Sequence, residues 1–203
     1  MSTKLLLVPF IVLIYLDVNC QERSNASNYI REQILIFKDS SESPLTKADF
    51  DRFDSIPYFK IDTNYIVTAH IKLTPDAEPF EMLTSTDRRP VYVTHGILHF
   101  ELKERHYQLS AYKNMAYLED EEYFKYMFIP FADETNGLET YGGGRFMELL
   151  IPEADSLILD FNQTFNPLCA YNHRYSCPKP PAENHLNVKI EAGVKTGLVF
   201  RKN

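Results

Sequence analysis

A glycine triplet followed by an arginine is the first group of residues whose types suggest chemistry. Gly142, Gly143 and Gly144 lie between Tyr141 and Arg145. Glycines let backbone N–H groups approach a ligand closely, and a guanidinium can grip a carboxylate or phosphate with two parallel hydrogen bonds. The pattern therefore predicts an anion-binding loop. The alternative, which stays open, is a bulge or tight turn into a strand, with Arg145 paired to a nearby acid.

Carboxylates and amides form a second candidate group. Asp160, Asn162 and Asn166 fall where a predicted strand should end, and such side chains commonly bond to their own backbone in turns. A carboxylate placed in a cleft can also act as a general base. Asp133, Glu139 and Asp160 are the candidates for that role.

Cysteine and histidine form a third group, with the spacing C-x3-H-x3-C-x7-H from Cys169 through His173 and Cys177 to His185. These residue types suit zinc, but the spacing matches no established zinc motif. In an exported protein a Cys169–Cys177 disulfide is favoured instead, and it would contribute about 2–3 kcal/mol by closing a short loop. Two free thiols and a metal site remain the alternatives.

The first twenty residues predict export. Lys4 precedes an apolar run of twelve residues, 5–16, which is too short for a comfortable membrane span but suits a signal peptide. Cleavage after Cys20, lipidation of Cys20 and a retained anchor are the three alternatives. The protein is therefore expected to be secreted or lipid-anchored at the cell envelope, and to touch a membrane only through residues 1–20.

Composition excludes some classes of function. The 203 residues suit one domain, and 44% hydrophobic residues are enough for a packed core. A net charge of −7 without a cluster of Lys and Arg argues against nucleic acid. The glycine triplet lacks the lysine and helix of a nucleotide-binding P-loop.

The elements that must position these residues are mostly strands. A helix is expected at 28–37, a linker follows up to residue 45, and a capping box at Thr46–Asp49 should open a second, short helix. Residues 46–203 then form one β-rich domain. Period-two alternation predicts strands at 65–73, 126–131, 145–151, 156–161 and 186–192.

A hairpin with a definite register is also predicted. A turn at Glu104-Arg105 places Leu102 opposite Tyr107 and Phe100 opposite Leu109, with all four side chains on one face. Short, frequent strands of this kind indicate an antiparallel meander closed as a barrel or sandwich, with a long irregular C-terminal loop.

Three blocks of sequence resemble a known family, the domain of unknown function family 1684. The blocks are D-x-T-x-G-x-E-T-Y-G-G-G-R at 133–145, D-F-N-x-x-x-N-P-x-C-A-Y at 160–171 and C-P-x-P-P-x-E-N at 177–184. The resemblance extends over nearly all of the chain after residue 20. It implies a small β-rich domain without a settled activity, and the cofactor stays unknown.

The favoured functional prediction is a pocket for a small polar or anionic ligand in the segment 139–184. Preorganised loops on a rigid scaffold commonly line such pockets. A hydrolase-type enzyme, a flavin-binding split-barrel relative and a purely structural envelope protein are the alternatives. The candidate ligand-binding residues are Tyr141, Gly142, Gly143, Gly144, Arg145, Asp160, Asn162, Asn166 and Tyr171.

Overall fold

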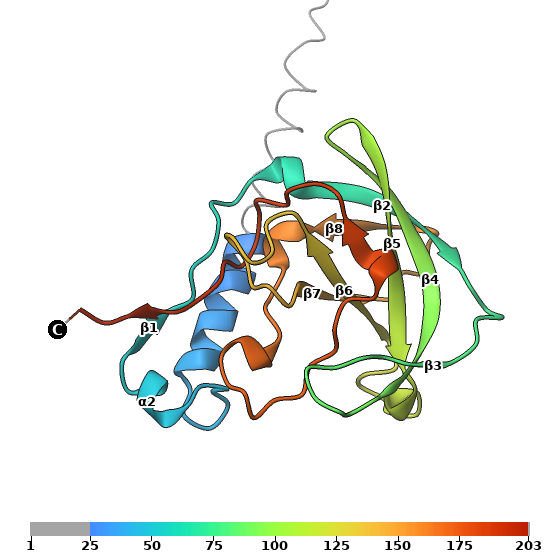
Figure 1. The fold of residues 1–203 in the computed structure, drawn as a ribbon. Helices are drawn as coiled ribbons and strands as arrows, with labels where there is room; N and C mark the ends of the chain where they lie inside the picture. Colours follow the sequence, from blue (N-terminus) through green and yellow to red (C-terminus); the bar gives the residue numbers. More distant parts are fainter. Residues whose placement is uncertain (1–24, 203) are drawn as a thin grey trace, which may run out of the picture.

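The fold is an antiparallel sheet curled into a half-barrel, seen in a computed structural model that describes residues 25–202 (Figure 1). The strand order is β7-β6-β5-β4-β2-β8, while β3 pairs with β4 and β9 runs parallel to β6. The mainly β fold class predicted from the sequence is confirmed. The predicted leader 1–20, with Cys20, lies outside the described residues.

The strands are β1 (Phe53–Ser55), β2 (Ile66–Leu73), β3 (Phe80–Glu81), β4 (Val91–Leu102), β5 (Arg105–Asn114), β6 (Tyr126–Asp133), β7 (Arg145–Leu150), β8 (Ser156–Asp160), β9 (His185–Leu186) and β10 (Val199–Phe200). The helical elements are an N-terminal helix at 25–38, α2 (Lys47–Phe50), and the 3-10 helices η1 (Thr63–Tyr65), η2 (Met115–Tyr117), η3 (Phe161–Gln163), η4 (Leu168–Ala170) and η5 (Ala182–Asn184). Within the part of the chain that the structure describes, no helix is both long and apolar enough to cross a membrane.

The predicted cap is present at the start of α2, although only the Thr46 half of a capping box is formed. Thr46 is the N-cap, and its hydroxyl accepts a hydrogen bond from the Asp49 backbone N–H at 3.2 Å. The same hydroxyl donates to the Asp49 carboxylate at 2.9 Å. This arrangement satisfies a backbone donor that the first helical turn leaves unpaired.

The β4–β5 hairpin has the predicted faces but a different register. Leu102 pairs with Arg105, and Phe100 with Tyr107, so each predicted partner is wrong by two residues. The turn is formed by Lys103 and Glu104, whose φ angles are 52° and 61°. A two-residue turn with both φ angles positive matches the twist of the strands, although this sequence has no glycine or asparagine there to signal it.

A bulge in β4 separates two groups of buried side chains. The pairing with β5 shifts between Thr94 and Gly96, so that His95 has no direct partner. The bulge therefore changes the face to which β4 side chains point, so that Thr94 pairs with Tyr112 and Gly96 with Ala111. These two β5 residues point to opposite faces of the sheet, and both are fully buried. Ala111 belongs to the core inside the half-barrel, whereas Tyr112 packs in a separate cluster beside β3. That second cluster forms one wall of the hollow described below.

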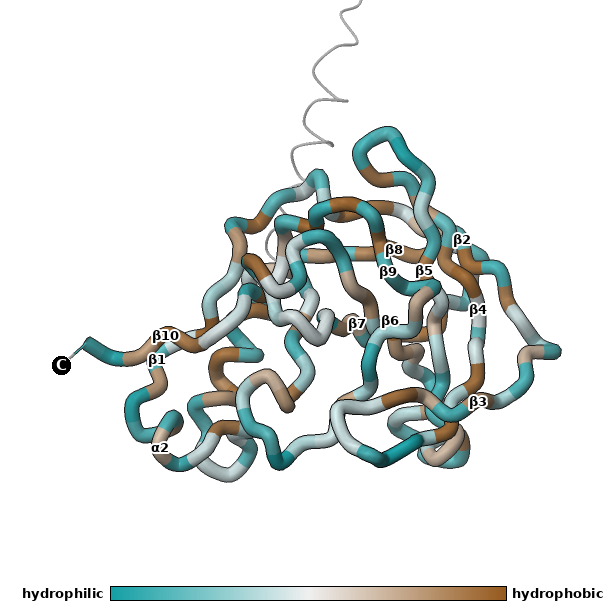
Figure 2. The backbone as a smooth tube through the Cα atoms, in the orientation of Figure 1, coloured by the Kyte–Doolittle hydropathy of each residue, from teal (hydrophilic) through white to brown (hydrophobic). Residues whose placement is uncertain are grey.

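The core lies on the concave face of the sheet. Leu98, Leu109, Ile129 and Leu159 come from four different strands and are fully buried. Burial of each such side chain stabilises the fold by about 1.5–3 kcal/mol. Figure 2 shows hydrophobic and hydrophilic residues alternating along the strands, while the tip of the β4–β5 hairpin is hydrophilic.

The strand predicted at 186–192 is largely absent. Only His185 and Leu186 pair with β6, and the chain beyond them is irregular. Ile190 and Ala192 are nevertheless fully buried, so the alternating pattern correctly marked an inward face. Their backbone carbonyl groups accept hydrogen bonds from the Arg145 side chain, which replaces a partner strand.

Candidate functional site

Arg145, the centre of the predicted ligand site, is fully buried. Its Nη2 donates to the Asp133 carboxylate at 2.5 Å and to the Ile190 carbonyl at 2.9 Å. Its Nη1 donates to the carbonyls of Ala192 and Val194. The guanidinium therefore joins the end of β6 to the C-terminal segment, and it lines neither of the two hollows described below.

The surroundings of Asp133 complete this buried polar network. The Asp133 carboxylate accepts hydrogen bonds from both the backbone N–H and the hydroxyl of Thr135. Thr135 is in turn hydrogen-bonded to Thr140 at 2.8 Å. Because a buried charge is stable only when paired and hydrogen-bonded, this arrangement accounts for Asp133 and Arg145 as structural partners.

Gly144 has a packing role. Its φ angle is +87°, and a Cβ atom placed there would lie 2.7 Å from the Phe131 carbonyl and 2.5 Å from Pro180. A larger residue therefore fits neither the backbone conformation nor the space. The glycine lets the chain turn tightly into β7, which was the alternative interpretation of the triplet.

The other predicted ligand-binding residues are mostly engaged with their own chain. Asn162 is buried, and its side-chain amide accepts a hydrogen bond from the backbone N–H of Asp62 and donates one to the Asp62 carbonyl. Asn166 donates from its side-chain amide to the Tyr171 hydroxyl and to the Lys195 carbonyl. The structure thus does not gather them in one pocket with Arg145; of the predicted set, Asp160 alone lines a described hollow.

Cys169 and Cys177 are free, buried thiols in the structure, so the predicted disulfide is not present. The Cys169 backbone N–H donates to the Cys177 sulfur at 3.2 Å, and the Tyr141 hydroxyl lies 3.9 Å from the Cys169 sulfur. A separate hydrogen bond between the two side chains lowers the pKa of the Cys169 thiol and raises the pKa of the Cys177 thiol. These hydrogen bonds satisfy the sulfur atoms in place of a covalent bridge.

The histidines of the predicted array, His173 and His185, are exposed. Among residues 25–202, no three or more His, Cys, Asp or Glu side chains are grouped so as to hold a metal ion.

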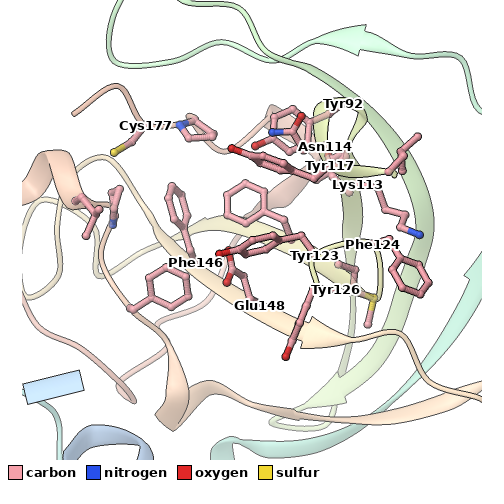
Figure 3. A pocket seen from close by; sticks show the side chains of 18 of the residues that line it. Tyr92, Lys113, Asn114, Tyr117, Tyr123, Phe124, Tyr126, Phe146, Glu148 and Cys177 are labelled. Atoms are coloured by element: carbon pink, nitrogen blue, oxygen red, sulfur yellow. The ribbon is translucent and has the colours of Figure 1, made fainter. Parts of the chain in front are cut away.

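A hollow of about 490 Å³ lies on the other side of β6 and β7 from the core, under the segment that joins β5 to β6. Nine aromatic side chains line it: Tyr92, Tyr112, Tyr117, Tyr123, Phe124, Tyr126, Phe128, Phe146 and Phe165. Lys113 and Glu148 are the only lining residues with an amino or a carboxyl group. Figure 3 shows Glu148 among the rings of Phe146, Tyr123 and Tyr126.

Glu148 is the most chemically distinctive of these residues. It faces away from the core on β7, where Met147 points inward and is buried. The surrounding walls displace part of the water around the side chain, although the residue stays exposed, and this partial desolvation raises the pKa of the Glu148 carboxyl. Although its side chain is exposed to the hollow, no described residue donates a hydrogen bond to it or forms an ion pair with it. The hollow therefore holds a carboxylate that lacks a cation.

A second hollow of about 730 Å³ adjoins the first. Five residues line both hollows: Tyr123, Tyr126, Glu148, Phe165 and Leu168. Its other walls come from the N-terminal helix and from the edge strands β7 and β8, including Tyr29, Leu149 and Ile158. The two hollows thus meet at Glu148.

Sequence reasoning predicted the strand that carries Glu148 but gave this residue no role. One signal was available, an acid in the middle of the apolar run F-M-E-L-L-I at 146–151. A second was the density of aromatic residues at 117–126. Neither signal shows that the two segments face one another, because that depends on the pairing of β6 with β7 and on the path of the chain before β6.

The three candidate general bases lie in different surroundings. Asp133 is paired with Arg145, and Glu139 lines neither hollow. Asp160 lines the second hollow, where it also caps η3 through a hydrogen bond from the Asn162 N–H.

The fold and site together define a class: an antiparallel half-barrel with an aromatic hollow against the outer face of two of its strands. Residues 51–195 match the model of the family described as protein of unknown function (DUF1684), and the chain belongs to that family. The resemblance noted in the sequence is thereby confirmed.

One solved structure extends the comparison. It is the solution NMR structure of an uncharacterised protein from gene locus rrnAC0354 of Haloarcula marismortui. It is similar with 34% sequence identity and a TM-score of 0.68, covering 89% of this chain and 96% of the other. No curated protein matches the chain.

Proposed function

We propose that this protein binds a small organic cation with an aromatic or apolar body in the first hollow. The observation that carries the proposal is Glu148, an unpaired carboxylate among nine aromatic side chains. An ammonium group would supply the missing charge partner, and aromatic faces attract cations. A volume of about 490 Å³ suits a small molecule.

The charge of the ligand follows from the surroundings of Glu148. A carboxylate whose pKa is raised by desolvation is destabilised in its ionised form, and a cation beside it reverses that effect. The one amino group of the lining, on Lys113, forms no ion pair with Glu148 in the structure. The anionic ligand predicted beside Arg145 remains a separate hypothesis.

Three probes of similar shape and different charge test the proposal. Titration of the ¹⁵N-labelled protein with 2-phenylethylamine, 2-phenylethanol and 3-phenylpropionate should give saturable shifts around Glu148 only with the amine. Glu148→Gln should weaken amine binding about tenfold or more, since a charge-assisted hydrogen bond contributes about 1.5–3 kcal/mol. Glu101→Gln, an exposed position on β4 outside both hollows, is the matched control. A preference for 3-phenylpropionate would contradict the proposal, and shifts around Arg145 rather than Glu148 would favour the anion-binding hypothesis.

Amine binding should also depend on pH. The amine favours ionised Glu148, so its affinity should be highest above the raised pKa of that carboxyl and fall as pH drops through it. The fall should begin at a higher pH than an ordinary glutamate would give. Isothermal titration between pH 4 and 8 measures this, and a profile that is flat in the wild type, or unchanged in Glu148→Gln, would contradict the role of Glu148.

A further inference from the structure

The second hollow holds a carboxylate that the proposed function leaves unexplained. Asp160 is only 8% exposed, yet no Lys, Arg or His lines this hollow and no described residue forms an ion pair with Asp160. Buried carboxylates are normally paired with a cation. Asp160 therefore differs from Asp133, the other buried carboxylate named above, which has Arg145.

The hydrogen bonds of Asp160 leave room for one more donor. Its Oδ1 accepts from the backbone N–H and the side-chain amide of Asn162, and its Oδ2 accepts from Gln163 at 2.8 Å. An ionised carboxylate has about four acceptor sites, so one stays open on Oδ2. All three donors are neutral amides, so they stabilise the carboxylate by hydrogen bonding but supply no opposite charge.

The hollow around Asp160 is continuous with the site of the proposed function. Glu148 and Tyr126 line both hollows, so a ligand that extends from the first hollow past Glu148 enters the second hollow directly. The charge of Glu148 also acts on Tyr29 of the N-terminal helix. The pKa of the Tyr29 hydroxyl is raised mainly by burial, then by Tyr58, and then by Glu148. Leu149 and Ile158 of the edge strands line the second hollow with apolar surface, and its third carboxylate, on Glu122, belongs to an exposed residue.

We infer that the natural ligand is an elongated amine with two cationic groups, one at Glu148 and one at Asp160, joined by an apolar chain, with its aromatic or apolar end in the first hollow. This inference rests on the proposed function, because it extends the same ligand beyond Glu148. The second hollow is then a subsite that selects a diamine over a monoamine.

Matched probes test the second charge. N-benzylbutan-1-amine carries one ammonium group. N-benzyl diamines carry a second ammonium group, separated from the first by three to six methylene groups. Isothermal titration should show that at least one diamine binds about tenfold more tightly than the monoamine. Asp160→Asn keeps an acceptor for the cap of η3 and removes the charge, so it should abolish this gain.

A second pair of variants keeps the test decisive if Asp160→Asn does not fold. Ile158→Trp places a large side chain in the second hollow from a position that is 52% exposed, and it should also abolish the gain. Leu73→Trp, at a position 57% exposed and outside both hollows, should keep it.

The outcomes separate the two proposals. If the monoamine binds at Glu148 and no diamine binds more tightly, the diamine subsite is wrong and the proposed function stands. If neither probe binds, both proposals are wrong. If a gain appears but persists in Ile158→Trp, the second ammonium group binds elsewhere and the subsite is again wrong.

Discussion

At the scale of single residues, the two acids Asp133 and Glu148 show how environment divides similar groups into different roles. Asp133 is buried beside a guanidinium 2.5 Å away, which supplies its counter-charge. Glu148 stands in an open hollow with no cation among its contacts, and its pKa is raised. The fold alone supplies a partner for the first acid but none for the second, to which the proposed function assigns a cationic ligand.

Replacement of Arg145 should therefore damage stability rather than binding alone. Arg145→Met leaves the Asp133 carboxylate buried without a cation, and removing one partner of a buried pair typically costs about 3–5 kcal/mol. Urea denaturation should show this loss. Arg105→Met, at an exposed position in β5, should change stability by less than about 0.5 kcal/mol. A fully stable Arg145→Met protein that fails to bind an anion would instead support the ligand predicted beside Arg145.

At the scale of elements, one backbone conformation at the end of the segment between β6 and β7 directs the chain into β7. Gly144 turns the chain with φ at +87° against the Phe131 carbonyl, directly before Arg145 enters β7. The position of Arg145, and of Glu148 three residues later on the opposite face of β7, depends on this turn.

Gly144→Ala should destabilise the protein by about 2 kcal/mol or more, because the left-handed conformation alone costs a non-glycine residue about 1–2 kcal/mol and the new Cβ also meets Phe131 and Pro180. Gly142→Ala is the control, since its nearest contact would be 3.7 Å away. Thermal unfolding of both variants measures the difference. Equal melting temperatures would show that Gly144 has no special role in the turn.

Prediction from the sequence succeeded for elements whose own residues determine them. The alternation in β4 and β5 gave the correct buried faces, and Thr46 with Asp49 gave the correct cap. Prediction failed where the conformation of a segment depends on a residue far away in the sequence. The segment 186–192 alternates like a strand, but Arg145 takes the hydrogen bonds that a partner strand would have made. The aromatic hollow was missed for the same reason, since residues 117–126 meet Glu148 only after the strands pair.

At the scale of the whole molecule, the site depends on a barrel that stays open. β7 and β8 are the two ends of the strand order and do not pair with each other. Their edges instead form walls of the second hollow, which the N-terminal helix borders on another side. A fully closed barrel would bond these strands directly and leave no space between Glu148 and Asp160.

Although the barrel is open between β7 and β8, its stability requires that the C-terminal segment stay packed against it. Ile190, Ala192 and Val194 are buried, and the carbonyl groups of these three residues accept the Arg145 hydrogen bonds. Burial of the isoleucine and the valine contributes about 1.5–3 kcal/mol each, and an Arg145 that loses its acceptors costs several more. Because a domain is stable by only about 5–15 kcal/mol, a chain that ends after Lys189 should lose its cooperative unfolding transition.

A chain that ends after Gly197 is the matched comparison. It lacks β10, whose only strand partner is β1, but it keeps the three buried residues and their carbonyl groups. Circular dichroism in urea should show a cooperative transition for this chain, at a moderately lower denaturant concentration than for the full protein. If the chain ending after Lys189 also unfolds cooperatively, Arg145 does not need these acceptors, and its burial has another cause.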